Sequence, residues 1–162
     1  MKKVMFLVMV AVMPFISCSS DDDSSGGQDQ LVGKWRESKS TEKSYVDGEF
    51  VETEVTETTD KDYFEVEFKA DGTFSEFYFE SYLSNGDSGE EIVETSTDGG
   101  TYEVKGDKII LHYNPYSDGS DGGTFEAQFS VSASSLTVIS IYQETYDNKT
   151  YRDETTTELY RL

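Results

Sequence analysis

The sequence has little cysteine, histidine, proline or positive charge. Its 162 residues include one Cys, one His, one Trp and two Pro, and 13 Lys and Arg stand against 33 Asp and Glu, a formal net charge of −20. A lone thiol has no partner for a disulfide within the chain. The negative field repels nucleic acid and anionic lipid headgroups, so we expect no nucleic-acid partner. We interpret the acidic residues as a solvated outer face.

Sequence motifs for catalysis are also missing. No HExxH, CxxC, GxGxxG or P-loop pattern occurs. The single histidine, His112, lies within the strand-like stretch KIILHY, where it is typical of a surface position. With 33 acidic residues, a pair of neighbouring carboxylates carries almost no information. We therefore expect no enzymatic activity, no catalytic residue and no cofactor.

The N-terminus has the pattern of an export signal. Lys2 and Lys3 precede an apolar segment over 4–16, which is too short to span a bilayer. The sequence then reads Phe-Ile-Ser before Cys18. This pattern predicts a signal peptide over 1–17. An ordinary secretory signal followed by a free cysteine is the alternative.

The stretch around Cys18 resembles the lipobox of bacterial lipoproteins. The resemblance implies cleavage before Cys18 and a covalent lipid on its thiol, so that acyl chains hold the protein to a membrane. The acidic cluster just behind it resembles the surface-export signal of Bacteroidota lipoproteins, and it comprises Ser20, Asp21, Asp22 and Asp23. That resemblance implies an outer-membrane protein exposed on the cell surface; the periplasmic leaflet is the alternative.

The segment 18–30 lacks residues that could form a core. It contains Ser, Asp, Gly and Gln, with no apolar residue after Cys18. Such composition is typical of a flexible acidic tether. We expect the folded domain to span 31–162.

Alternation of apolar and polar residues dominates that domain, and no stretch has sustained helical periodicity. Turn dipeptides such as Asp47-Gly48, Gly99-Gly100 and Asp147-Asn148 separate the strands. The pattern predicts an all-β fold, an antiparallel up-and-down meander of eight or more strands that closes into a β-barrel. A β-sandwich is the competing architecture. The expected strands are 31–38, 42–46, 49–58, 62–70, 73–83, 91–96, 100–105, 108–114, 124–132, 135–145 and 151–161.

The hairpin at Asp71-Gly72 allows two registers. A two-residue turn pairs Phe68 with Ser75, whereas a three-residue loop with Gly72 in the left-handed region pairs Phe68 with Phe74. A shift of one residue exchanges the two faces of the strand. We favour the second register because it pairs two rings, and it leaves Phe77 and Phe79 on the outer face.

The motif LVGKW resembles the opening strand of lipocalins, in particular the small lipocalin-like domains of bacterial lipoproteins. The stretches FKADGTF, GGTYEVKGDKIIL, SSLTVISIY and LYRL agree in order and spacing over about 31–162. The resemblance implies that Leu31, Gly33 and Trp35 lie at the closed end of a calycin barrel. It also implies that a basic residue, Arg161 or Arg152, packs on the indole.

The predicted inner face offers a candidate ligand site. Its lining would be Phe64, Val66, Phe68, Phe74, Tyr78, Ile109, Leu111, Phe125, Phe129, Leu136 and Val138. Barrel mouths hold small molecules, so we expect a small hydrophobic or amphipathic ligand. In the alternative, these side chains fill the barrel, and the protein acts as a surface interaction or structural lipoprotein through its loops and the outer aromatic residues Tyr45, Phe50, Phe77 and Phe79.

A loop over 114–124 is a weak calcium candidate. Asp118, Ser120 and Asp121 lie among glycines there and supply oxygen ligands. The loop lacks the regular acidic spacing of an EF-hand, and an exposed loop without metal is the simpler interpretation. We therefore expect no metal site.

Overall fold

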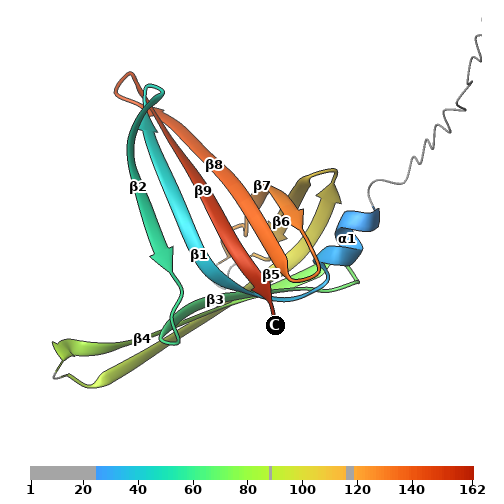
Figure 1. Cartoon of the computed structure of the whole chain (residues 1–162), viewed down its shortest axis with the longest axis horizontal. Helices are drawn as coiled ribbons and strands as arrows, with labels where there is room; N and C mark the ends of the chain where they lie inside the picture. Colours follow the sequence, from blue (N-terminus) through green and yellow to red (C-terminus); the bar gives the residue numbers. More distant parts are fainter. Residues whose placement is uncertain (1–24, 88, 116–118) are drawn as a thin grey trace, which may run out of the picture.

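The computed structural model describes residues 25–87, 89–115 and 119–162. The predicted signal peptide, the Cys18 lipidation site, the export signal at Ser20 and Asp21 to Asp23, and the calcium candidate Asp118 lie outside these ranges. In the described part, one short helix precedes nine strands (Figure 1). They are α1 (Ser25–Leu31), β1 (Gly33–Val46), β2 (Glu49–Glu57), β3 (Asp62–Phe68), β4 (Thr73–Asp87), β5 (Glu91–Lys105), β6 (Lys108–Tyr113), β7 (Thr124–Val131), β8 (Ser135–Tyr146) and β9 (Lys149–Arg161).

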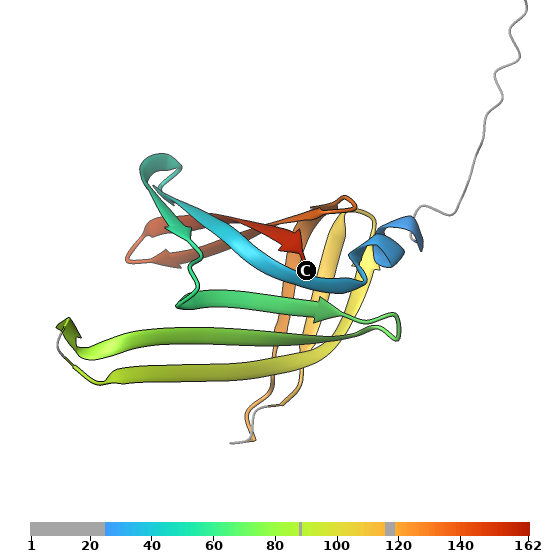
Figure 2. The same cartoon turned by 60° about the horizontal axis from the view of Figure 1, so that its bottom comes forward.

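The strands form one antiparallel sheet that closes on itself. The first residues of β1 pair with β3, the following strands pair in chain order from β3 to β9, and β9 pairs back along β1. The closed ring therefore contains eight strands, and β2 is an additional strand that pairs with the second half of β1. Figure 2 shows the ring with β6 and β7 crossing between its two sides. The predicted all-β barrel is confirmed, and the sandwich alternative is wrong.

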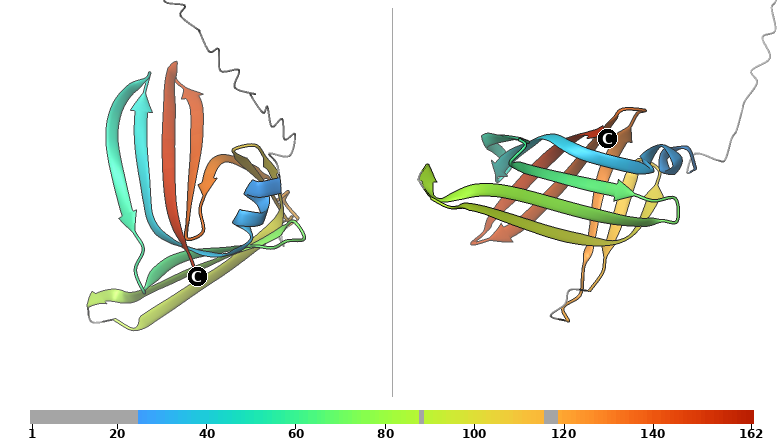
Figure 3. Two further views of the ribbon diagram at one scale, coloured as in Figure 1. Left: turned by 45° about the vertical axis from the view of Figure 1, so that its right-hand side comes forward. Right: turned by 90° about the horizontal axis from the view of Figure 1, so that it is seen from below.

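The strands differ in length, and this difference shapes the molecule. The long ends of β1, β2, β8 and β9 form a first arm, and the long β4–β5 hairpin forms a second arm (Figures 1 and 3). The two arms diverge from the end of the barrel that lies away from α1. Two pairs of expected strands are merged: 42–46 and the part of 31–38 from Gly33 onward belong to β1, and 91–96 and 100–105 belong to β5. Leu31, expected at the start of the first strand, is instead the last residue of α1.

Gly99-Gly100 was predicted as a turn and lies instead inside β5. The two glycines occur where β5 crosses closely between its neighbours. A Cβ on Gly99 would lie 2.7 Å from the Phe74 carbonyl oxygen, and a Cβ on Gly100 would overlap the His112 carbonyl. The absence of side chains allows this close approach of backbones.

The segment 25–31 corrects the predicted flexible tether. Instead of an unstructured run up to residue 30, Ser25–Leu31 forms α1, which lies against the barrel near β7. Leu31 is fully buried. The folded part that the structure describes therefore includes Ser25–Leu31. Within the described ranges, no helix is long and apolar enough to cross a membrane.

The core occupies the end of the barrel next to α1. It contains side chains from every strand of the ring together with one from the helix, namely Leu31, Trp35, Val66, Phe68, Phe74, Tyr102, Ile109, Leu111, Ala127, Leu136 and Leu159. Phe68 pairs with Phe74, with Gly72 at a φ of 81°, so the favoured register of the hairpin is confirmed. This register decides which side chains of β4 face the interior.

Candidate functional site

The closed end of the barrel is built around Trp35. Its side chain is fully buried, and its Nε1 donates a hydrogen bond of 2.8 Å to the Leu31 carbonyl at the end of α1. The Arg161 guanidinium lies over the indole at 4.2 Å from the ring centroid. Gly33 has a φ of 139°, and a Cβ there would overlap the same guanidinium. Arg152, the other residue considered for this contact, lies instead over Tyr45.

Above this closed end lies an apolar cavity of about 100 Å³. Its walls come from β3, β4, β6, β8 and β9, which surround the barrel axis. The lining residues are Phe64, Val66, Phe68, Glu76, Ile109, Leu111, Leu136, Val138, Thr157 and Leu159. Seven of them were among the eleven expected from the sequence, because alternation places them on the inner face.

The other four expected residues occupy different positions. Phe74 is buried in the core, and Phe129 packs against its edge. Tyr78 and Phe125 are each 37% exposed, so neither is enclosed by the barrel. Their register partners, Phe64 and Leu111, line the cavity, so the predicted facing is right.

Glu76 is the carboxyl group among the cavity-lining side chains, and it was not among the lining residues expected from the sequence. It lies between Phe74 and Tyr78 on the inner face of β4. The Tyr113 hydroxyl donates a hydrogen bond of 3.0 Å to its Oε1. Burial raises the pKa of Glu76, and nearby Asp98 raises it further against the opposing effect of that hydrogen bond. Side chains alternate between the two faces of a strand, so Glu76 lies on the same face as Phe74, and this alternation could have identified it.

Polar groups continue beyond the cavity toward the arms. Burial raises the pKa of Glu37, to which Asp62 adds a like charge. Desolvation, together with Asp62 and Glu80, raises the pKa of Tyr78 to about 12. The inner surface therefore changes from apolar at the closed end to acidic where the arms begin.

The interpretation of the acidic residues as a solvated outer face holds only in part, because several of them lie on the inner face of the sheet, where Glu42, Glu52 and Glu94 are nevertheless exposed to solvent. Residues paired directly across antiparallel strands share a face, and the pairing continues the inner face along both arms. The carboxylates assigned to that face are Glu37, Glu42, Glu49, Glu52, Glu54, Asp62, Glu76, Glu80, Glu94, Asp98, Glu144 and Asp153.

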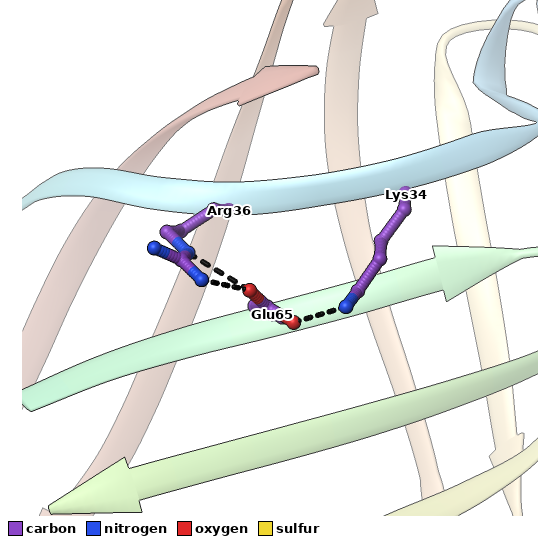
Figure 4. A network of polar contacts seen from close by, with 3 residues as sticks. All are labelled: Lys34, Arg36 and Glu65. Carbon is purple, nitrogen blue, oxygen red and sulfur yellow. Dashed lines mark hydrogen bonds and ion pairs between the residues drawn. The ribbon is translucent and has the colours of Figure 1, made fainter. Parts of the chain in front are cut away.

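The outer face of β1 and β3 carries a compact ion network (Figure 4). Lys34 Nζ lies 2.5 Å from Glu65 Oε2, and Arg36 Nε donates a hydrogen bond of 2.8 Å to Glu65 Oε1. The interpretation of the acidic residues as solvated does not hold for Glu65, of which only 4% is exposed. Its burial opposes ionisation, but the hydrogen bonds from Lys34 and Arg36 outweigh this effect and lower the pKa of Glu65. The network thus explains how a carboxylate is buried outside the barrel.

Beside this network, three rings gather on the outer face, as the register predicted for Phe77 and Phe79. Tyr63 stacks on Phe79 with centroids 4.9 Å apart and contacts Phe77 at 6.0 Å. Arg36 lies over Tyr63 at 4.2 Å from the ring centroid. Tyr45 and Phe50 form a separate edge-to-face pair at the tip of the first arm.

Two solved structures are similar to the chain. One is a lipocalin-like protein from Bacteroides uniformis, 18% identical, with a TM-score of 0.44, covering 82% of this chain and 99% of that chain. The other is an uncharacterized protein from Bacteroides eggerthii, 14% identical, with a TM-score of 0.38, covering 76% of this chain and 98% of that chain. No family model and no curated protein matches the chain. The function is therefore inferred from this chain's own residues.

The calcium candidate gains no support from the described side chains. Ser120 and Asp121 are exposed, and Asp118 lies outside the described ranges. Among the residues that the structure describes, no group of three or more His, Cys, Asp or Glu side chains is arranged to hold a metal ion.

Proposed function

We propose that this protein is a lipid-anchored, non-catalytic, lipocalin-like binding protein, which holds a small hydrophobic or amphipathic ligand in its barrel. The observation that carries the proposal is the cavity, where nine of the ten lining residues are neutral and one, Glu76, is a carboxyl. Ligand sites in proteins combine mostly apolar walls with a few placed polar groups. The cavity has this composition.

The size of the cavity limits what enters it. At about 100 Å³, it is smaller than the roughly 150 Å³ apolar cavity that binds benzene in another protein. A short alkyl segment or a small ring portion fits this volume. The rest of the ligand would extend past Glu76 toward the arms, where the surface is polar, and this favours an amphipathic molecule over a purely apolar one.

Binding can be tested by filling the cavity. We expect the full-length protein purified from membranes to carry a bound small molecule in native mass spectrometry. Val138→Trp should remove that mass because the indole would occupy the cavity. Ile139→Trp is the matched control, since the adjacent residue lies on the opposite face of β8. A protein that carries no ligand in either form, and binds no short amphiphile added to it, would contradict the proposal.

Anchoring and location form the second part of the proposal. Cleavage before Cys18 would leave a lipidated cysteine, and the acidic cluster Ser20 and Asp21 to Asp23 would direct the protein to the cell surface. Cys18→Ala should move the protein from the membrane fraction to the soluble fraction. Replacing Asp21 to Asp23 with alanine should keep it in the membrane but remove its labelling on intact cells. Retention of Cys18→Ala in the membrane would contradict the anchor.

The outer rings support a second function. Tyr63, Phe77 and Phe79 form a group of contacting rings beside Arg36. Aromatic and Arg side chains are enriched in protein interfaces. In this alternative, the protein acts as a surface interaction or structural lipoprotein. Combined Phe77→Ala and Phe79→Ala substitutions should then abolish crosslinking to a partner on intact cells, and Val138→Trp should leave that crosslinking unchanged.

A further inference from the structure

We propose that the ligand is an organic cation, an amine with a short apolar group, which places its apolar part in the cavity and its ammonium group against Glu76 and the acidic inner face beyond it. The inference rests on the proposed function and adds the charge of the ligand. It follows from the distribution of charged residues between the two faces of the sheet.

Most basic residues of the strands lie on the outer face. The register assigns to it Lys34, Arg36, Lys39, Lys43, Lys105, Lys108 and Arg152. On the inner face, Arg161 is at the closed end, where it donates hydrogen bonds to the carbonyls of Val32 and Ala133. Lys149 is at the tip of the first arm, next to the β8–β9 turn. Between these two positions, the described inner face holds no Lys or Arg.

The ion pairs follow the same division. In the described part of the chain, the acidic partners of Lys and Arg are outer-face residues, namely Glu65, Glu103, Glu126, Glu154 and Glu158. The inner-face carboxylates have no such partner among the described residues. Five outer-face carboxylates are thus paired within the protein, whereas the inner-face carboxylates are left to solvent or to a ligand at the barrel.

Glu76 connects this charge to the cavity. It lines the apolar cavity directly, and its register partner on β5 is Asp98. Two carboxyl groups side by side in a partly buried site repel one another, and a cation between them relieves the repulsion. Concave surfaces lined by one sign of charge concentrate counterions of the opposite sign. The same field disfavours fatty acids and phosphorylated ligands.

Three probes of equal chain length separate charge from apolar contact. We would measure binding of hexylamine, 1-hexanol and hexanoate to the full-length protein by isothermal titration calorimetry at neutral pH and low salt. Hexylamine should bind at least 10-fold more tightly than hexanol, and hexanoate more weakly than hexanol. Raising the salt concentration should weaken hexylamine binding and leave hexanol unchanged.

Substitutions then locate the cation. Glu76→Gln should weaken hexylamine binding about 10-fold and leave hexanol binding unchanged, which also reports that the cavity is intact. Glu67→Gln, an exposed outer-face position on β3, should change neither. Val138→Trp should abolish binding of both probes.

The outcomes distinguish the two proposals. Equal binding of hexylamine and hexanol, sensitive to Val138→Trp, would overturn the cationic ligand and retain the binding function. Hexylamine binding that survives Val138→Trp would also overturn the inference. So would hexylamine binding that is abolished by the addition of calcium ions alone. Either result would report binding to general surface charge. Binding of none of the three probes would contradict both the inference and the proposed function.

Discussion

Arg161 covers Trp35, and the two residues are also register partners on β9 and β1. The contact therefore joins the last strand to the first where the barrel closes. Arg161 Nη1 donates a hydrogen bond of 2.7 Å to the Val32 carbonyl, and its Nη2 donates one of 2.5 Å to the Gln30 carbonyl. One side chain thus links the C-terminal strand, the end of α1 and the indole.

Arg161→Gln should destabilise the protein by about 2–4 kcal/mol, since it removes a cation–π contact and charge-assisted hydrogen bonds together. Chemical denaturation followed by circular dichroism measures the change. Arg152→Gln is the matched control, because Arg152 also lies over a ring, Tyr45, near the tip of an arm. It should cost less than about 1 kcal/mol. Equal losses in the two variants would contradict the special role of Arg161.

Trp35→Phe should destabilise the protein because the smaller ring leaves a cavity and the Leu31 carbonyl loses its donor. We expect a loss of about 2–3 kcal/mol, and about 3–5 kcal/mol for Trp35→Ala. Since Trp35 is the single tryptophan, wild-type emission should be blue-shifted and should move to the red on unfolding. A native spectrum typical of exposed indole would be inconsistent with its burial.

Gly100→Ala should prevent folding or cost several kcal/mol, because the new Cβ would overlap the His112 carbonyl. Gly27→Ala is the control. Gly27 lies in α1, and a Cβ there would make ordinary van der Waals contacts with Phe129 and Val104. Alanine is favoured over glycine in a helix by about 1 kcal/mol. Thermal melts of both variants should therefore shift in opposite directions.

The pH dependence of Glu65 has a definite sign. Its pKa in the folded protein is lowered, so its contribution to stability is present above the ordinary value near 4.5 and is lost as the pH falls through the folded value. Glu65→Gln should lower Tm at pH 7 and converge with the wild type in acid. A Tm difference that is independent of pH would show that the ion network contributes nothing.

Glu76 should behave in the opposite way. Its pKa is raised by burial, so the stability of its neutral form is present below the unfolded value and is lost as the pH rises through the folded value. Glu76→Gln removes that loss and should raise Tm at pH 8 by roughly 2–5 °C. Near pH 4 the two proteins should melt together. A variant less stable than the wild type at pH 8 would contradict this sign.

Local alternation was enough to predict much of the barrel. In DYFEVEF it assigned Phe64, Val66 and Phe68 to the interior, and the turn chemistry of Asp71-Gly72 selected the pairing of Phe68 with Phe74. These features depend on neighbouring residues, which the sequence displays directly. The indole-covering arginine was expected only through the family resemblance.

Features that depend on distant strands were not predictable in the same way. The burial of Glu65 requires Lys34 and Arg36 from another strand, and the position of Gly99 and Gly100 inside β5 requires the backbones on either side. The helix α1 has too few apolar residues to show a period, and its order comes from packing against the barrel. The acidic inner face emerges only when all registers are combined.

The extra strand β2 has a consequence for association between molecules. Outside the closed ring of eight strands, β2 pairs with β1 alone, and all nine of its residues are exposed. This strand carries four glutamates, namely Glu49, Glu52, Glu54 and Glu57. Repulsion between like charges discourages the addition of a strand from a second molecule. Protonation in acid would weaken that repulsion. Solubility of the protein should therefore fall at low pH before the barrel itself unfolds.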